Sequence, residues 1–336
     1  MLIWLLPVFT GFSFFLTWVL RRYALVRSIM DIPNARSSHS VPTPRGGGVA
    51  IVLSFLLALP VFALVDAVDL RSMWALLGAG VGIAVLGFID DHGHIAARWR
   101  LLGHFAGAAW MLFWLGGLPA LSFFGRTLEL GWIGHVLATV YLVWLLNLYN
   151  FMDGIDGIAS VEAICVCLGG ALLYGVRGEP ALALPPLLLA AAVTGFLFWN
   201  FPPARIFMGD AGSGFLGVIL GGLSLQAAWA SPPLLWSWLI LLGVFIVDAT
   251  WTLARRLLRG DRLYQAHRSH AYQHASRRFG HKPVTLAVLV INTVWLFPVA
   301  LLVALQYLEG SVGLLLAYVP LMLLAVRFDA GKREAG

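Results

Sequence analysis

The feature that most constrains the fold of this chain is a succession of apolar runs, each long enough to cross a lipid bilayer. A membrane-spanning helix needs roughly 20 mostly apolar residues. Of the 336 residues, 60% are hydrophobic and only 11% are charged, whereas a soluble domain carries about 25% charged residues. We therefore predict an all-α polytopic integral membrane protein that forms a single domain over residues 1–336. Eleven spans are predicted, or ten if closely abutting pairs merge, at residues 2–20, 47–65, 72–89, 101–118, 132–149, 158–175, 181–198, 212–228, 233–254, 284–305 and 311–326.

The basic residues predict the orientation, because cytoplasmic loops are enriched in Lys and Arg. If loop 21–46 is cytoplasmic, every Lys and Arg except Arg71, Arg126 and Arg177 falls on the same side. The net charge of +6 then follows from topology and gives no reason to expect a nucleic-acid partner. The predicted cytoplasmic loops cover residues 21–46, 90–100, 150–157, 199–211 and 255–283.

A polar stretch, Asn150-Phe-Met-Asp153-Gly-Ile-Asp156-Gly, follows one of these apolar runs directly. A carboxylate costs roughly 2.5–3.5 kcal/mol near mid-bilayer and less toward the interface, so these two call for a cation, a nucleotide or a proton. On a helix, Asn150, Asp153 and Asp156 would share one face. Such side chains suit a sugar or a pyrimidine edge. The alternative is a polar turn that joins two spans.

Two further acidic sites fall on the same predicted side of the membrane, at Asp90-Asp91 and at Asp210. Adjacent carboxylates do not both ionise cheaply without a nearby cation. Mg²⁺ prefers a few carboxylates together with phosphate oxygens and waters. Asp210 could complete such a metal shell, and Phe207 could stack on a flat base. The alternatives are a solvated acidic pair and an Asp210 that only caps a helix.

Three other features carry open interpretations. Gly46-Gly47-Gly48 opens a predicted helix and could cradle an anion with its N–H groups, or could belong to a flexible loop. Asp248, inside a predicted span, is expected to be structural and neutralised by Arg255 or Arg256. In the basic loop, His267, His270 and His274 would share one helical stripe, which suits phosphate, a zinc ion or lipid headgroups.

Four motifs occur in order on successive predicted cytoplasmic loops, and together they resemble one known family. They are Phe88-Ile-Asp90-Asp91, Asn150-Phe-Met-Asp153-Gly-Ile-Asp156-Gly, Asn200 with Phe207-Met-Gly-Asp210, and His267-Arg-Ser-His270. This pattern resembles the polyprenyl-phosphate N-acetylhexosamine-1-phosphate transferases, the superfamily of MraY and WecA within glycosyltransferase family 4. It looks closest to the branch of WbpL type, which starts O-antigen synthesis.

The resemblance implies an enzyme that transfers a sugar 1-phosphate from a UDP-hexosamine to undecaprenyl phosphate and releases UMP. It implies a Mg²⁺ cofactor, with Mn²⁺ as a substitute, and a site on the cytoplasmic face of a bacterial inner membrane. The expected partners are the lipid acceptor, the nucleotide sugar and membrane lipids, and a homodimer stays open. By position, the resemblance assigns catalysis to Asp90 and Asp91, the metal to Asp210 with Asp90 as a further candidate, the nucleotide and sugar to Asn150, Asp153, Asp156, Asn200 and Phe207, and phosphate to His39, His94, His267, Arg268 and His270.

Two departures from the family pattern bear on the substrate. His94 stands where the family often has Lys, and Arg268 and Ser269 interrupt a histidine cluster. They indicate a sugar other than the peptide-bearing peptidoglycan precursor, such as N-acetylglucosamine, N-acetylgalactosamine or a 6-deoxy hexosamine. Direct attack by the lipid phosphate is favoured over a covalent carboxyl intermediate, because that phosphate is already largely ionised. A transporter of phosphorylated or lipid-linked solutes is the alternative from another class.

Overall fold

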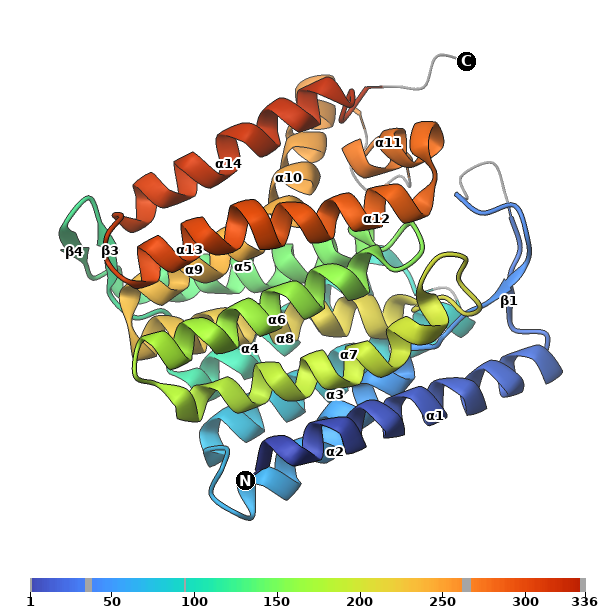
Figure 1. Ribbon diagram of the computed structural model, residues 1–336, viewed down its shortest axis with the longest axis horizontal. Coiled ribbons are helices and arrows are strands. Elements are labelled where there is room, and N and C mark those ends of the chain that lie inside the picture. Colours follow the sequence, from blue (N-terminus) through green and yellow to red (C-terminus); the bar gives the residue numbers. More distant parts are fainter. Residues whose placement is uncertain (1, 34–37, 94, 262–266, 333–336) are drawn as a thin grey trace.

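The chain folds into a bundle in which most helices lie side by side and nearly parallel (Figure 1). The computed structural model describes residues 2–33, 38–93, 95–261 and 267–332. In chain order the α-helices are α1 (Leu6–Val26), α2 (Gly48–Ala63), α3 (Leu70–His92), α4 (Ala97–Leu115), α5 (Gly131–Met152), α6 (Ile158–Val176), α7 (Leu184–Asn200), α8 (Asp210–Ala230), α9 (Pro232–Leu241), α10 (Gly243–Leu258), α11 (Ala271–Phe279), α12 (His281–Val290), α13 (Phe297–Ala304) and α14 (Gly310–Arg327).

The remaining regular structure is short. The 3₁₀ segments η1 (Leu2–Leu5) and η2 (Pro180–Ala183) precede α1 and α7, and the π-helical segment η3 (Ile291–Leu296) joins α12 to α13. Two antiparallel hairpins pair β1 (Met30–Asp31) with β2 (Thr43–Pro44) and β3 (Leu121–Phe123) with β4 (Arg126–Leu128).

Each predicted span has a helical counterpart, and the all-α polytopic membrane fold is confirmed. The predicted ninth span is broken: α9 and α10 meet at a bend of 70°. The tenth is continuous through α12, η3 and α13. Within the described ranges, seven helices are long and apolar enough to cross a membrane, or eight if the bent pair counts as one span. The helix α2 is shorter, with 16 residues, and the arginines of α1 and α4 make those helices less apolar.

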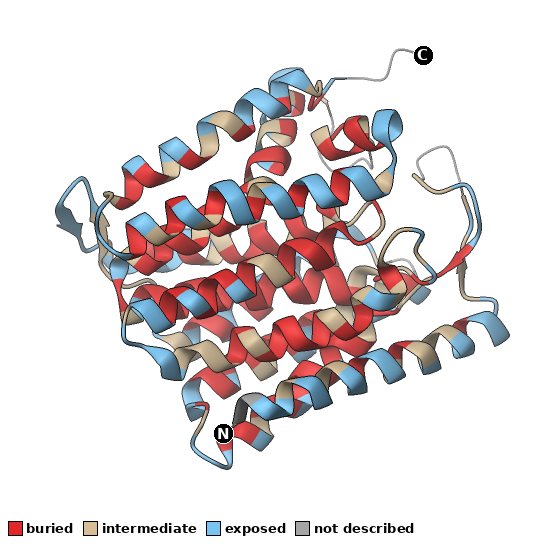
Figure 2. Cartoon of the chain, in the orientation of Figure 1, coloured by how far each residue is buried: buried red, intermediate tan, exposed pale blue. Residues whose placement is uncertain are grey.

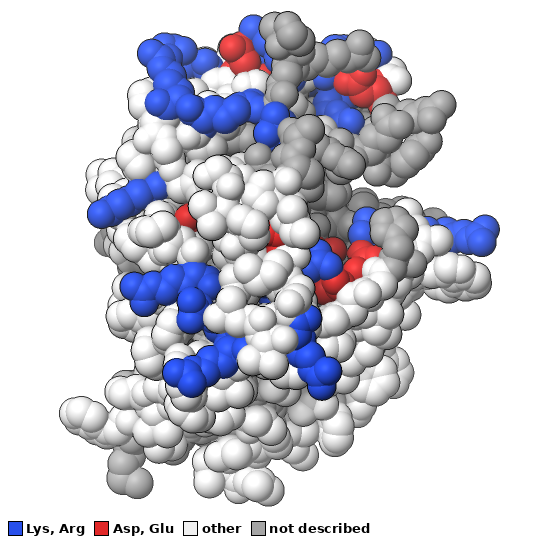
Figure 3. All heavy atoms as spheres, turned by 90° about the vertical axis from the view of Figure 1, so that its right-hand side faces the viewer, with Lys and Arg blue, Asp and Glu red and all other residues white. Residues whose placement is uncertain are grey.

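The described parts of the predicted cytoplasmic loops gather at one end of the bundle, on the right in Figure 1. This follows from the alternating direction of the helices: α1, α3, α5 and α7 end there, and α2, α4, α6 and α8 begin there. Seen end-on in Figure 3, this face carries many Lys and Arg side chains around a smaller group of acidic ones. The charge asymmetry expected from the sequence is therefore a property of the folded molecule.

The centre of the bundle is α8, whose apolar window is entirely buried. It packs between α3 and α5, and the interior in Figure 2 is correspondingly buried. Small residues allow this close packing: a Cβ added to Gly217 would lie 2.6 Å from Leu146 Cα of α5. Because α8 is fixed on all sides, its first residue, Asp210, is held in place at the basic end of the bundle.

Candidate active site

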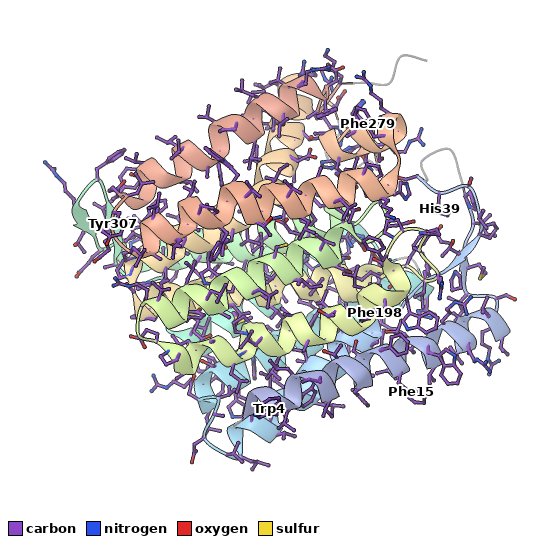
Figure 4. All side chains as sticks on the ribbon, viewed as in Figure 1. Trp4, Phe15, His39, Phe198, Phe279 and Tyr307 are labelled. Atoms are coloured by element: carbon purple, nitrogen blue, oxygen red, sulfur yellow. The ribbon has the colours of Figure 1, made fainter. Side chains whose placement is uncertain are left out.

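A cavity of about 380 Å³ opens at the basic end of the bundle, where loops from distant parts of the sequence meet. Eight of the predicted site residues line it. In Figure 4 one of them, His39, lies at this end, whereas Tyr307 lies at the opposite end. The predicted residues that line the cavity are His39, Asp91, Asn150, Asp153, Asp156, Asn200, Phe207 and Asp210.

Asp153 and Asp156 reach the cavity from a loop. The prediction that they share a helical face with Asn150 is wrong, because α5 ends at Met152 and α6 begins only at Ile158. Burial raises the pKa of Asp153 well above its ordinary value, and the carboxylates of Asp210 and Asp91 push it in the same direction. Within the described residues, the Asp153 carboxylate accepts no hydrogen bond, so it is free to bind a cation.

Asp156 is held in a different way. Its Oδ1 lies 3.2 Å from Nδ1 of His281, and its Oδ2 accepts the N–H of Ala204 at 3.0 Å. Burial alone would raise the pKa of Asp156, but the hydrogen bonds from His281 and Ala204 outweigh it and lower that pKa. The carboxylate therefore joins α12 to the loop before α8 while it lines the cavity.

Asp91 and Asp210 meet where α3 and α8 are in close contact. A Cβ at Gly87 of α3 would lie 2.6 Å from the N atom of Ala211, so only glycine permits this contact. One turn on, the carboxylate of Asp91 accepts the N–H groups of Asp210 and Ala211 at 3.2 and 3.3 Å. Asp91 thus caps α8 from another helix, and the interpretation of Asp210 as only a cap is wrong.

Asp210 is the first residue of α8 and keeps its carboxylate for the cavity. The amide of Asn150 hydrogen-bonds that carboxylate and also donates to Oγ of Ser213 at 3.1 Å. Asn150 therefore orients Asp210 from the end of α5. This places an amide and a carboxylate side by side on one cavity wall.

Asp90 does not line this cavity. Its carboxylate pairs with Arg100 at 2.7 Å and accepts the N–H of Ile95 at 3.0 Å. It lines instead a much smaller void, about 20 Å³, together with His104 and Asp210. Asp90 and Asp91 are adjacent in sequence but point to different partners, because consecutive residues on a helix face different directions.

The ring of Phe207 lies in an edge-to-face contact with His39, with ring centroids 4.8 Å apart. Backbone pairing fixes this segment: the N–H of Phe207 donates to Pro44, while Gly47 and Gly48 donate to Phe207 and Met208, each at 2.8–2.9 Å. The predicted anion cradle at Gly46–Gly48 is therefore wrong, since the N–H groups of Gly47 and Gly48 are already used.

Asn200 lines the cavity, but its side chain is committed to the backbone. Its Oδ1 accepts the N–H of Gly157 and its Nδ2 donates to the carbonyl of Ile206, both at 3.0 Å. The residue thereby ties the loop after α5 to the segment that carries Phe207. Its assigned contact with the nucleotide remains a prediction.

The basic loop is anchored by Asp248 of α10. The carboxylate of Asp248 accepts the N–H groups of Ala271 and Tyr272 at 2.9 and 3.0 Å and lies 3.4 Å from the ring of His270. Asp248 is structural, as expected, but its predicted neutralisation by Arg255 is wrong, because Arg255 donates to the carbonyl of Ala330.

The predicted histidine stripe is also wrong. The helix α11 begins at Ala271, so His267 lies outside it, and its ring stacks on that of His270 at 5.0 Å. Burial, followed by the neighbouring His270, lowers the pKa of His267 to about 3. The residues His267, Arg268 and His270 do not line the cavity, and His94 lies outside the described residues, so their phosphate role remains a prediction.

Among the cavity residues to which the sequence assigned no site role are Arg45, Gln273 and His281. Arg45 hydrogen-bonds the backbone carbonyl of Asp91. Gln273 accepts the N–H of His270 and so belongs to the capped start of α11. His281 is the first residue of α12. None of them stood in a motif, and only the neighbouring glycine marked His281 as a helix start.

The donor set fits Mg²⁺ held together with a substrate. Among the described residues, no group of three His, Cys, Asp or Glu stands close enough to hold a metal on its own. Mg²⁺ commonly uses one or two carboxylates, and phosphate oxygens and waters fill its remaining positions. The unpartnered carboxylate of Asp153, close to that of Asp210, matches this requirement.

Comparisons with known proteins indicate the family of the chain. Residues 73–228 match the family model described as glycosyl transferase family 4. A probable undecaprenyl-phosphate N-acetylglucosaminyl 1-phosphate transferase of Bacillus subtilis is 32% identical over 83% of this chain and 79% of its own length. A decaprenyl-phosphate N-acetylglucosaminephosphotransferase of Mycolicibacterium smegmatis is 31% identical over 79% and 74%. A phospho-N-acetylmuramoyl-pentapeptide-transferase of Moorella thermoacetica is 36% identical over 55% and 61%.

Proposed function

The chain belongs to glycosyl transferase family 4, and we propose that it transfers an N-acetylhexosamine 1-phosphate from a UDP-sugar to undecaprenyl phosphate. UMP is the second product, and the donor sugar is an N-acetylhexosamine or its 6-deoxy form. The observation that carries this proposal is the cavity, which gathers carboxylates, amides and an aromatic ring at one end of a membrane bundle. The Bacillus and Mycolicibacterium relatives are named for an undecaprenyl phosphate and a decaprenyl phosphate, which supports the same class of acceptor here.

The position of the cavity suits the two substrates. The acceptor is a phosphate on a long hydrocarbon, whose tail stays in lipid, and the donor is soluble. Such a reaction requires a site at a membrane interface. The enrichment of Lys and Arg at this end supports a cytoplasmic face, and we place the protein in a bacterial inner membrane.

We assign the nucleotide to the wall formed by Phe207, His39 and Asn150. The ring of Phe207 offers a flat apolar surface for a base, and the contact with His39 holds that ring in place. Asn200 contributes indirectly, because its amide donates to the carbonyl of Ile206 and so fixes the backbone next to Phe207. We assign the ribose or the sugar to the amide of Gln273 and to the remaining lone pairs of the Asp156 carboxylate.

Asp210 and Asp153 would hold Mg²⁺, with Mn²⁺ as a substitute. The bound ion would neutralise the diphosphate and make UMP a better leaving group. Asn150 keeps the Asp210 carboxylate directed into the cavity. Asp91 contributes by capping α8, which fixes the position of Asp210.

The chemistry we propose is direct displacement. An oxygen of the lipid phosphate forms a bond to the phosphorus that bears the sugar, and the bond from that phosphorus to the bridging oxygen breaks. The electron pair of that bond leaves with UMP. Asp90 is paired with Arg100 and Asp91 with two N–H groups, so neither carboxylate is placed as a nucleophile. This commitment of both acids favours direct attack over a covalent intermediate.

The decisive experiment measures UMP release by purified protein with undecaprenyl phosphate, Mg²⁺ and a panel of UDP-hexosamines. We expect one donor, or a few closely related donors, to yield UMP only when lipid and metal are both present. The product sugar would show whether the enzyme serves O-antigen or another cell-envelope glycan. A folded protein that releases no UMP from any donor, but moves a lipid-linked or phosphorylated solute across proteoliposomes, would establish the transporter alternative instead.

A further inference from the structure

His281 lies on the cavity wall although no motif contains it. It is the first residue of α12, and both of its ring nitrogens face oxygen acceptors. Nδ1 lies 3.2 Å from Oδ1 of Asp156, and Nε2 lies 3.2 Å from the carbonyl oxygen of Ser38. The N–H of Asp156 is farther from Nδ1, at 3.5 Å. Both ring nitrogens are therefore engaged, and their shorter contacts are with oxygen atoms.

These contacts connect segments that are far apart in sequence. Ser38 precedes His39, Asp156 belongs to the loop after α5, and His281 begins α12. Two further hydrogen bonds reinforce the junction. Oγ of Ser38 donates to the carbonyl of Gly154, and Oγ1 of Thr285 donates to that of Asp156, both at 2.8 Å. His281 therefore stands where the two sides of the cavity mouth are joined.

We propose that His281 is a positioning residue for the donor. It holds the Asp156 carboxylate and the segment that carries His39 at a fixed separation, so that the nucleotide wall keeps its shape. This inference rests on the proposed function, because it concerns how the same cavity holds a UDP-sugar. A residue that only positions the donor should affect KM for that donor much more than kcat.

The first test is steady-state kinetics of UMP release by His281→Ala and His281→Gln. We expect the Ala variant to raise the KM for the UDP-sugar about tenfold or more, since hydrogen bonds to a charged group are lost, while kcat stays within about twofold. Gln keeps one N–H donor group, which can reach one of the two acceptors, and should give an intermediate KM. The matched control is His135→Ala, an exposed histidine near the start of α5 at the opposite end of the bundle, which should leave both constants unchanged.

A second test is a double-mutant cycle with Asp156→Asn. If His281 acts through Asp156, the rise in KM in the double variant should be much smaller than the product of the rises in the two single variants. Multiplicative effects would contradict the inference, as would an unchanged KM in folded His281→Ala or His281→Gln protein. A loss confined to kcat would also overturn it, because it would indicate a role in the chemical step.

Wild-type protein that releases no UMP from any donor would refute the proposed function and this inference together. An active wild type with an unaffected His281→Ala variant would refute the inference alone.

Discussion

Asp210 and Asp248 are both acidic residues on helices that reach the basic end of the bundle, yet their surroundings differ completely. Asp248 accepts two backbone N–H groups and the hydroxyl of Thr252, and it lies beside the ring of His270. Asp210 accepts no backbone N–H among the described residues and faces the cavity beside Asn150. An acid whose oxygens are satisfied by the fold stabilises it, whereas an acid left without such donors is available to a ligand.

The same distinction divides the other acids of the site. Asp90, Asp91, Asp156 and Asp248 each accept at least one backbone N–H, and we call them the engaged carboxylates. Asp153 and Asp210 accept none within the described residues, and we call them the open carboxylates. The engaged group should matter most for stability, and the open group should matter most for metal-dependent activity. The predictions below test that division, beginning with the largest effect.

Removal of the metal should abolish activity. The open carboxylates need a cation to bind a diphosphate, so EDTA is expected to reduce UMP release to background, and added Mg²⁺ or Mn²⁺ should restore it. The engaged carboxylates do not depend on the metal, so the unfolding temperature should change little. Activity that survives exhaustive chelation would show that the open carboxylates have another purpose.

Asp210→Asn should reduce kcat by roughly a hundredfold or more and weaken the dependence on Mg²⁺, because the change removes a charge from the open pair. The backbone N–H of residue 210 still donates to Asp91, so folding should be preserved. The measurement is UMP release against Mg²⁺ concentration, with thermal unfolding as the control. Near-normal turnover would rule out the metal role of Asp210.

Asp248→Asn should chiefly lower stability. Both carboxylate oxygens accept N–H groups from the start of α11, and an amide that turns its NH₂ toward one of them loses that bond, at about 1–3 kcal/mol. We expect a lower unfolding temperature and yield in detergent, with substantial activity left in the folded fraction. Complete loss of activity in well-folded protein would place Asp248 with the open carboxylates.

Asp153→Asn should stabilise the metal-free protein near pH 7, by about 1 kcal/mol. Burial raises the pKa of Asp153, followed by the repulsion of Asp210 and Asp91. The pKa of Asp153 is therefore higher in the folded protein than in the unfolded chain, where it is about 3.9. The free energy of unfolding then falls as pH rises above about 3.9, because the carboxyl ionises less readily in the folded protein. The substitution removes this loss. Unfolding measurements in EDTA across pH 4–8 should therefore show that the variant is more stable than wild type by an amount that grows with pH. A destabilised variant would indicate an undetected partner for Asp153.

Asp156→Asn should destabilise the protein by about 1 kcal/mol, which is opposite in sign to the effect of Asp153→Asn and similar in size. Burial alone would raise the pKa of Asp156, but His281 and Ala204 lower it. The stabilisation is therefore fully present above the unfolded pKa of about 3.9 and is lost as pH falls through the lower folded value. The difference in stability between wild type and variant, measured by thermal unfolding, should be constant between about pH 5 and 7 and should vanish in acid. Equal stability at neutral pH would remove Asp156 from the engaged group.

The sequence by itself determined the fold class, the approximate spans and eight of the residues that line the cavity. Apolar runs and clustered acids are local properties of the sequence. An apolar helix long enough to span a bilayer forms there whichever helices pack against it. Loops that alternate between two membrane faces also bring Asp91, Asp153 and Asp210 to one end, whichever helices pack together. The matching family motifs followed from the same local patterns.

Only the tertiary structure decided which of these acids are open. Asp91 is engaged because α3 and α8 approach at Gly87 and present N–H groups from a remote helix. His270 turns toward Asp248 because α11 begins there, and His281 reaches the cavity because α12 starts beside the loop after α5. These contacts, two of which join residues more than a hundred positions apart, depend on the complete packing of the bundle, and no local pattern encodes them.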